Sequence, residues 1–475
     1  MAVTSLGTYI TVKGLAYTGL ILICLVLPLG LLTDFPLVPF ALILAVFWIV
    51  LNVRYPYVGL LCYAVFILVR PNEFITALSI PMIEKAIVAP VFLGLIIKVI
   101  FSRKREFLRT SLERVIVGFV GVAFLSILTS VWVSGAWKSW FDVFRLLIIF
   151  VFVIQLIDTE KQFRLFVFIF LLTGGFHAVS SIVQYYMGIR GFAMGIDRAI
   201  GMDLSYGAPN SLAATVIYTL PFIYCYYLST RSRLMRLFLI SVTLASTWCI
   251  ILTGSRTGML GVVFFVILVA MQHENKLRNF LIGFVLLVVA FVAMPDQYRA
   301  RLESSTDLSG QSGAAMSAHG RIDGLVNGVR MMIDRPLLGV GIGQYRVALG
   351  SIYGKGWWEA HSLPGQLFGD LGLLGTIAFV AWVWTLFGNL RRLDRHPRDS
   401  HRGAVFLNAI VLAVKMEILC LLFMGLGGHN LYRYNWFFAS AMVVVMLKLT
   451  RDRLAPSVDA ATEASEESNR SAQNG

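Results

Sequence analysis

Long apolar runs constrain this chain more than any other feature of its sequence. A helix needs about 20 mainly apolar residues to cross a bilayer, and such runs follow one another almost from end to end. They lie near residues 15–32, 36–52, 56–70, 82–101, 113–133, 141–157, 163–187, 211–228, 234–253, 257–272, 278–294, 364–388, 403–424 and 431–449. Charged residues make up only 14% of the 475 residues, against roughly 25% in soluble proteins. We therefore expect one all-α polytopic membrane domain over residues 1–454, with about 12–14 transmembrane helices.

The two ends of the chain differ in character. The run at 15–32 is preceded by Lys13 and followed by Thr33-Asp34-Phe35-Pro36, which is not a small-residue cleavage motif. We interpret it as a signal anchor that remains as the first helix. Residues 455–475 are rich in Ser, Glu, Ala and Asn, a composition that cannot bury a core. They are predicted to be a disordered cytoplasmic tail.

The net charge of +14 is concentrated in loops that share one side of the predicted topology. Arginine and lysine gather in residues 102–114, 230–236 and 389–402, and the positive-inside rule makes that side cytoplasmic. This distribution explains the charge without a nucleic-acid partner. The opposite side then holds a long connection at 295–363 and two lesser loops, 188–210 and the short turn at 253–257, and we expect the functional site there.

An amphipathic helix is predicted inside the long extracytoplasmic loop. Apolar side chains recur at helical spacing until Pro336 ends the pattern; they are Ile322, Leu325, Val326, Val329, Met332 and Ile333. Such a helix is typical of a membrane surface. Arg321 stands at its start, where a helix N-terminus favours an anion. The alternative is an interfacial arginine whose charge reaches the lipid headgroups.

Other candidate residues lie on the same predicted side. Arg256 occupies a short turn between two apolar helices, where a charge is often functional but can also serve as a headgroup anchor. His361 precedes Pro364, the predicted start of a helix, and histidine can accept a proton near neutral pH. His429 is its rival, whereas His177 is interpreted as a core residue. The Gly339-Val340-Gly341-Ile342-Gly343 run is interpreted as a turn rather than a phosphate loop, because no strand–helix unit surrounds it.

Four short stretches together resemble the O-antigen ligase and polymerase superfamily. They are Arg198-Ala199-Ile200-Gly201 with Pro209-Asn210, then Gly254-Ser255-Arg256-Thr257-Gly258, then Gly320-Arg321 through Pro336-Leu337-Leu338-Gly339-Val340-Gly341, and finally Ala360-His361 with Gly369-Asp370-Leu371-Gly372. The family often has Asn and Glu where this chain has Ser362 and Asp370. The resemblance covers about residues 198–380.

The resemblance implies a GT-C-like, metal-independent membrane glycosyltransferase without a cofactor. It would transfer a glycan from undecaprenyl diphosphate to a lipid, glycan or protein acceptor at the periplasmic face of the bacterial inner membrane. Arg256 and Arg321 match the family's paired arginines and Arg198 is a lesser candidate; arginine suits a diphosphate because its planar fork binds phosphate oxygens bidentately. His361 matches the residue that takes the acceptor's proton.

Rival interpretations remain open from the sequence alone. The same fold can serve a repeat-unit polymerase or a protein O-oligosaccharyltransferase, which differ only in the acceptor. A permease or flippase would instead need a polar path across the bilayer. Its candidate residues are Lys415, Glu417, His177 and Arg145.

Overall fold

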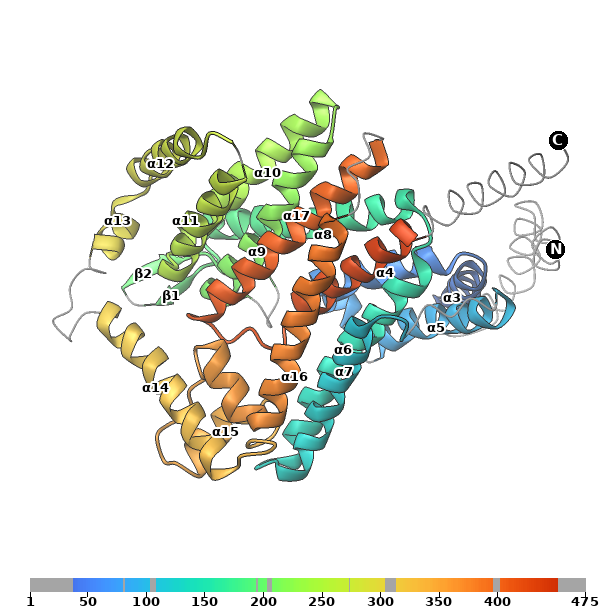
Figure 1. Ribbon diagram of the computed structural model, residues 1–475, viewed down its shortest axis with the longest axis horizontal. Coiled ribbons are helices and arrows are strands. Elements are labelled where there is room, and N and C mark those ends of the chain that lie inside the picture. Colours follow the sequence, from blue (N-terminus) through green and yellow to red (C-terminus); the bar gives the residue numbers. More distant parts are fainter. Residues whose placement is uncertain are drawn as a thin grey trace, which may run out of the picture. The chain divides into compact units, whose positions relative to one another are not determined.

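The computed structural model describes residues 37–79, 82–102, 108–193, 195–202, 207–272, 274–303, 313–395 and 402–451. The predicted signal anchor at 15–32 and the predicted tail at 455–475 lie outside these residues. Nearly all of the described chain is helical (Figure 1). The longer helices are α3 (Leu37–Arg54), α4 (Pro56–Val69), α5 (Ile83–Ser102), α6 (Ser111–Leu125), α7 (Val133–Leu156), α8 (Glu160–Tyr186), α9 (Pro209–Ser229), α10 (Arg233–Leu252), α11 (Arg256–Met271), α12 (Lys276–Val292), α14 (Gly313–Asp334), α16 (Leu363–Asp394), α17 (Arg402–Gly425) and a helix at 434–451. The shorter elements are η1 (Pro71–Glu73), η2 (Thr76–Leu78), η3 (Ser126–Thr129), α13 (Asp296–Glu303), α15 (Tyr345–Ser351) and the hairpin β1 (Gly191–Ala193) and β2 (Ile196–Arg198).

The prediction of a polytopic all-α membrane protein is confirmed. Seven helices in the described part are long and apolar enough to cross a bilayer, and up to nine if each of two bent pairs is one span. The pairs are α3 with α4, bent by 116°, and α12 with α13, bent by 118°. The sequence interpretation treats α3 and α4 as separate spans. The number of spans, 12–14, stays a prediction.

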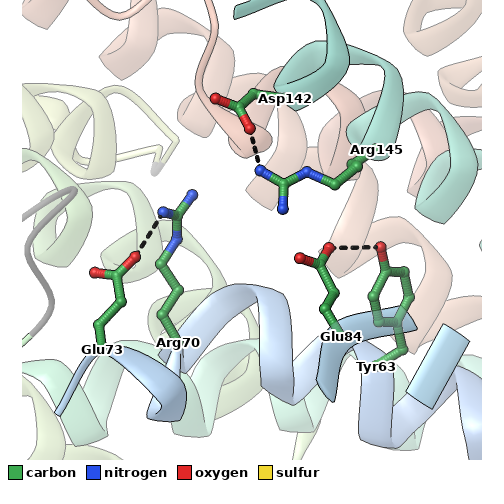
Figure 2. A network of polar contacts seen from close by, with 6 residues as sticks. All are labelled: Tyr63, Arg70, Glu73, Glu84, Asp142 and Arg145. Atoms are coloured by element: carbon green, nitrogen blue, oxygen red, sulfur yellow. Dashed lines mark hydrogen bonds and ion pairs between the residues drawn. The ribbon is translucent and has the colours of Figure 1, made fainter. Parts of the chain in front are cut away.

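Two compact units make up the chain. The first consists of residues 1–107 and 151–157 and contains α3, α4 and α5. Within it, Arg70 forms an ion pair with Glu73 at 3.0 Å, and the Tyr63 hydroxyl donates to Glu84 at 3.3 Å (Figure 2). The ion pair lies where the chain leaves α4, and the Tyr63 hydrogen bond joins the middle of α4 to the start of α5.

The second unit contains residues 108–150 and 158–475, and α9 lies in its core. This helix is apolar around its whole circumference and packs against α8, α10, α11 and α17, as expected for a fully surrounded helix. A second packed region joins α6 and α16 to the helix at 434–451 through aromatic side chains. There Trp382 packs on Phe119 and Phe437 and donates from Nε1 to Ser440 Oγ at 2.8 Å.

The helix predicted around 322–333 is confirmed as part of α14, which packs along α16. The contact is made by glycines. A Cβ on Gly324 would lie 1.8 Å from the Ala360 carbonyl oxygen, and one on Gly328 would lie 2.3 Å from that of Gly365. The six apolar side chains that predicted the helix do not form this contact as a group. Four of them are exposed, namely Ile322, Leu325, Val326 and Ile333. This outward apolar face is what a helix at a membrane surface requires.

Helix α16 is broken at Gly372, whose φ of 60° and ψ of −152° are non-helical. The Gly339–Gly343 run fills the break. The N–H groups of Val340 and Gly341 donate to the carbonyls of Gly369 and Asp370 at 2.9 and 3.1 Å. In return, the N–H groups of Leu373 and Leu374 donate to Pro336 and Leu337 at 2.8 and 3.1 Å. The glycine run is therefore a turn, as predicted.

Candidate functional site

The turn between α10 and α11, residues 253–257, is the centre of the candidate site. Gly254 has a φ of 56°, a conformation that glycine adopts without strain. Ser255 caps α11, because its hydroxyl accepts the Gly258 N–H at 3.1 Å. Thr253 and Ser255 are buried. The backbone of this turn is therefore fixed and points its carbonyls at neighbouring elements.

Arg198 reaches the turn from the end of β2. Its Nε donates to the Thr253 carbonyl at 2.6 Å and its second terminal nitrogen to Asn210 Oδ1 at 2.8 Å. Asn210 lies in the first turn of α9, so the Arg198 and Pro209-Asn210 motifs meet here. Burial, together with the positive charges of Arg301 and Arg256, lowers the pKa of Arg198 to about 10. It remains a cation at neutral pH.

Arg256 begins α11, and hydrogen bonds link this end of the turn to Arg301 of α13. The Arg256 Nε donates to the Arg301 carbonyl at 3.2 Å, and the Arg301 Nε donates to the Gly254 carbonyl at 2.9 Å. The sequence interpretation missed Arg301. In the sequence it is one of several charged residues that follow the apolar run 278–294, and the pattern alone does not distinguish it.

Arg321 comes to the same turn from α14. Its Nε donates to the Gly427 carbonyl at 3.3 Å and its second terminal nitrogen to Thr257 Oγ1 at 2.8 Å. Burial and the charge of Arg256 lower its pKa. Arg198, Arg256, Arg301 and Arg321 thus form an arginine cluster, in which a backbone carbonyl holds each Nε. The structure brings together all three arginines that the sequence singled out.

His361 lies beside this cluster, directly before α16. It adopts a φ of 50°, a backbone conformation that is uncommon for a non-glycine residue and that is found at active sites among other places. The following Ser362 caps α16 by accepting the Gly365 N–H at 3.2 Å. The close approach of Gly324 to Ala360 places His361 about one helical turn from Arg321 along α14.

The environment of His361 keeps its ring neutral. The residue is partly exposed, yet burial of its ring by neighbouring groups lowers its pKa, as do the nearby His429 and Arg321, whereas Glu359 raises it. The His429 ring centroid is 5.9 Å from that of His361. Burial lowers the pKa of His429 further, to about 4, with a contribution from Arg433. The two rings are neighbours, and His361 is the more basic of the two.

The segment after α17 is a structural support that the sequence interpretation treated only through His429. Asn430 donates to the Leu421 carbonyl at 2.8 Å and to the Tyr218 hydroxyl at 3.0 Å. Arg433 donates to Thr215 Oγ1 at 2.8 Å on α9. These contacts fix the backbone that offers the Gly427 carbonyl to Arg321.

Asp370 is also structural. It is 1% exposed, and its two carboxyl oxygens accept the Tyr345 N–H at 2.7 Å and the Tyr432 hydroxyl at 3.1 Å. It therefore ties α15 and the segment after α17 to the break in α16.

Comparison with known protein families finds one match. Residues 239–380 match the O-antigen ligase family. The matched segment includes Arg256, Arg301, Arg321 and His361, whereas Arg198 and His429 lie outside it. The match confirms the resemblance for the three motif stretches that lie within it; the stretch at 198–210 lies outside it. No curated protein matches the chain. Within the described ranges, no three His, Cys, Asp or Glu side chains are grouped so that they could hold a metal ion.

Proposed function

We propose that this protein is a membrane glycosyltransferase of the O-antigen ligase type, which transfers a glycan from undecaprenyl diphosphate to an acceptor. The observation that carries the proposal is the arginine cluster held on one turn beside His361. The family match supports a ligase or a related polymerase. The donor and the roles of the individual residues are our proposal.

The reaction requires charge stabilisation at the leaving group. The bond between the anomeric carbon and the phosphate oxygen breaks, and its electron pair stays with the phosphate, which gains one negative charge. A new bond forms from the acceptor oxygen to the anomeric carbon. Arg256 and Arg321, assisted by Arg198, would bind the diphosphate and stabilise the charge that develops, without a metal ion. Their Nε bonds orient them before the donor arrives.

The acceptor side requires a base. His361 would take the proton that the attacking hydroxyl loses, because a neutral imidazole is a competent general base. Its lowered pKa keeps it neutral at pH 7. His429, with a pKa of about 4, is the weaker base and would mainly line the site.

The contacts within the site agree with the predicted topology. Arg198 and Arg321 link the start of α9, the turn from α10 to α11 and the segment after α17. The predicted topology assigns all these helix ends to the extracytoplasmic side. This agreement supports a multi-pass protein of the bacterial inner membrane with its site facing the periplasm.

Contacts within the second unit also bear on the permease alternative. Lys415 forms an ion pair with Asp394, Glu417 accepts from Asn435 at 2.9 Å, and Arg145 pairs with Asp142 (Figure 2). Each of these side chains has a polar partner close by, so these contacts do not themselves form the polar path across the bilayer that a permease needs. The acceptor, whether lipid, glycan or protein, distinguishes the ligase from the polymerase and oligosaccharyltransferase variants.

Purified protein and a gene deletion test the proposal together. Deletion should remove a surface glycan and accumulate its lipid-linked donor. Purified protein should transfer the glycan in excess chelator; activity that vanishes with chelator and returns with Mg²⁺ or Mn²⁺ would contradict a metal-independent mechanism.

Variants separate the two roles. Arg256→Ala and Arg321→Ala should weaken donor binding about ten- to a hundredfold. His361→Ala should leave donor binding near normal while transfer falls about a hundred- to ten-thousandfold. His429→Ala is the matched control and should be mild. Near-normal transfer by His361→Ala, with a loss in His429→Ala, would reverse the assignment.

A further inference from the structure

Helix α13 is fixed at two points that place its last turn in the candidate site. The Tyr298 hydroxyl, on a side chain that is 1% exposed, donates to the Asp197 carbonyl at 2.8 Å. Asp197 directly precedes Arg198. At the other end of α13, the Arg301 Nε donates to the Gly254 carbonyl. Arg301 is therefore held between the strand that carries Arg198 and the turn that carries Arg256.

The hydrogen bonds of Arg301 orient it in the same manner as the other members of the cluster. Its Nε, like theirs, is bound to a main-chain carbonyl. An arginine that is held through Nε keeps its planar fork in one orientation, which reduces the entropy lost when it binds phosphate oxygens. Simple surface anchoring would not require this shared arrangement around one five-residue turn.

The concentrated positive charge of the cluster favours a ligand with more than one negative charge. Four guanidinium groups within one region repel one another, and the charges of Arg301 and Arg256 both lower the pKa of Arg198. A polyanion relieves this repulsion more than a singly charged ligand does, because the interaction grows with the product of the charges. A lipid diphosphate carries two phosphates, and its leaving form has one more negative charge than the donor.

We propose that Arg301 is a fourth ligand of the donor's diphosphate and that it favours a polyprenyl diphosphate over a polyprenyl monophosphate. The inference rests on the proposed function and deepens it. Arg301 lies on α13, outside the motifs that suggested Arg198, Arg256 and Arg321. Its role would be to bind the donor and to stabilise the leaving diphosphate, and it takes no proton in the reaction.

The test compares Arg301→Gln with Arg299→Gln in the full-length protein. Arg299 lies on the same helix but donates to the Met294 carbonyl at 2.9 Å, toward the end of α12. The affinities for undecaprenyl diphosphate and for undecaprenyl monophosphate are measured for each variant in lipid nanodiscs, together with the melting temperature. Arg301→Lys is a second variant, which keeps the charge but loses the fork.

Arg301→Gln should lose about ten- to a hundredfold in affinity for the diphosphate, and clearly less for the monophosphate. Arg301→Lys should lie between it and the wild type, and Arg299→Gln should match the wild type. Equal losses for both lipids, or no loss for either, would overturn the assignment and leave Arg301 as a structural anchor. If the wild type binds neither lipid, the proposed function itself fails. A wild type that binds the diphosphate, with an Arg301→Gln variant that binds it equally well, rejects this inference alone.

Discussion

Replacing Gly324 with alanine should move His361 away from the arginine cluster, although it removes no charged group. Gly324 lies one helical turn after Arg321, and its α-carbon faces the backbone of Ala360, the residue before His361. A Cβ there would be 1.8 Å from the Ala360 carbonyl oxygen. Since real Cβ contacts are essentially never shorter than 3.0 Å, α14 and the segment at 360–361 must separate by about 1.2 Å.

This displacement sets the expected size of the effect. A misplacement of about 1 Å between reacting groups can reduce a rate about a hundredfold, so we expect transfer by Gly324→Ala to fall by at least that factor. Helix propensity acts in the opposite direction, because alanine stabilises a helix by roughly 0.8–1 kcal/mol relative to glycine. A loss of activity would therefore reflect the contact with Ala360.

Two neighbouring glycines provide a graded control. Gly328→Ala would meet the Gly365 carbonyl oxygen at 2.3 Å, which requires a smaller shift, so its effect should be intermediate. A Cβ on Gly320 would meet no described atom within 4 Å, and Gly320→Ala should transfer like the wild type. The assay is single-turnover transfer at saturating donor, with the melting temperature measured in parallel. Equal activity of Gly324→Ala and Gly320→Ala would refute the reasoning, as would equal losses in both.

Two further predictions concern pH and topology. Transfer should rise as the pH increases through the pKa of His361, with a midpoint below the ordinary histidine value of about 6.5. Glu359→Gln removes a charge that raises this pKa, so the midpoint of the pH–rate profile should move to lower pH; an upward shift would contradict the assigned base. In a variant without the exposed Cys62, a cysteine at Lys355 should react with an impermeant reagent added from outside, whereas cysteines at Arg233 and Arg395 should not. Labelling at Arg233 or Arg395 without labelling at Lys355 would contradict the predicted topology.

The sequence predicts the helices well because their apolar length alone specifies them. The described helices from α3 to α12, together with α16, α17 and the helix at 434–451, each coincide with a predicted apolar run. Periodicity cannot show a sharp bend between two apolar helices. The bends from α3 to α4 and from α12 to α13 therefore appear only in the structure.

The site was predictable where a charge stands in an apolar context. Arg256 and His361 are conspicuous because a charged or titratable group is unexpected at those positions. Arg301 is not conspicuous, since α13 is rich in charged residues and only its contact with Gly254 distinguishes it. The periodicity of apolar residues also does not show which face of α14 packs against α16. Glycine contributes nothing to an apolar pattern, yet two glycines four residues apart, Gly324 and Gly328, are a sequence signal of close helix contact.

The break in α16 has a consequence for how the protein is assembled. Four backbone hydrogen bonds that a continuous helix would make within itself are supplied here by residues 336–341, which precede the helix in sequence. In a region from which water is excluded, each peptide group left without a partner costs several kcal/mol. The part of α16 around the break at Gly372 therefore reaches its final form only when residues 336–341 dock against it. Completion of the site is thus a late step of biogenesis, which follows the insertion of the helices and depends on the extracytoplasmic loop having already crossed the membrane.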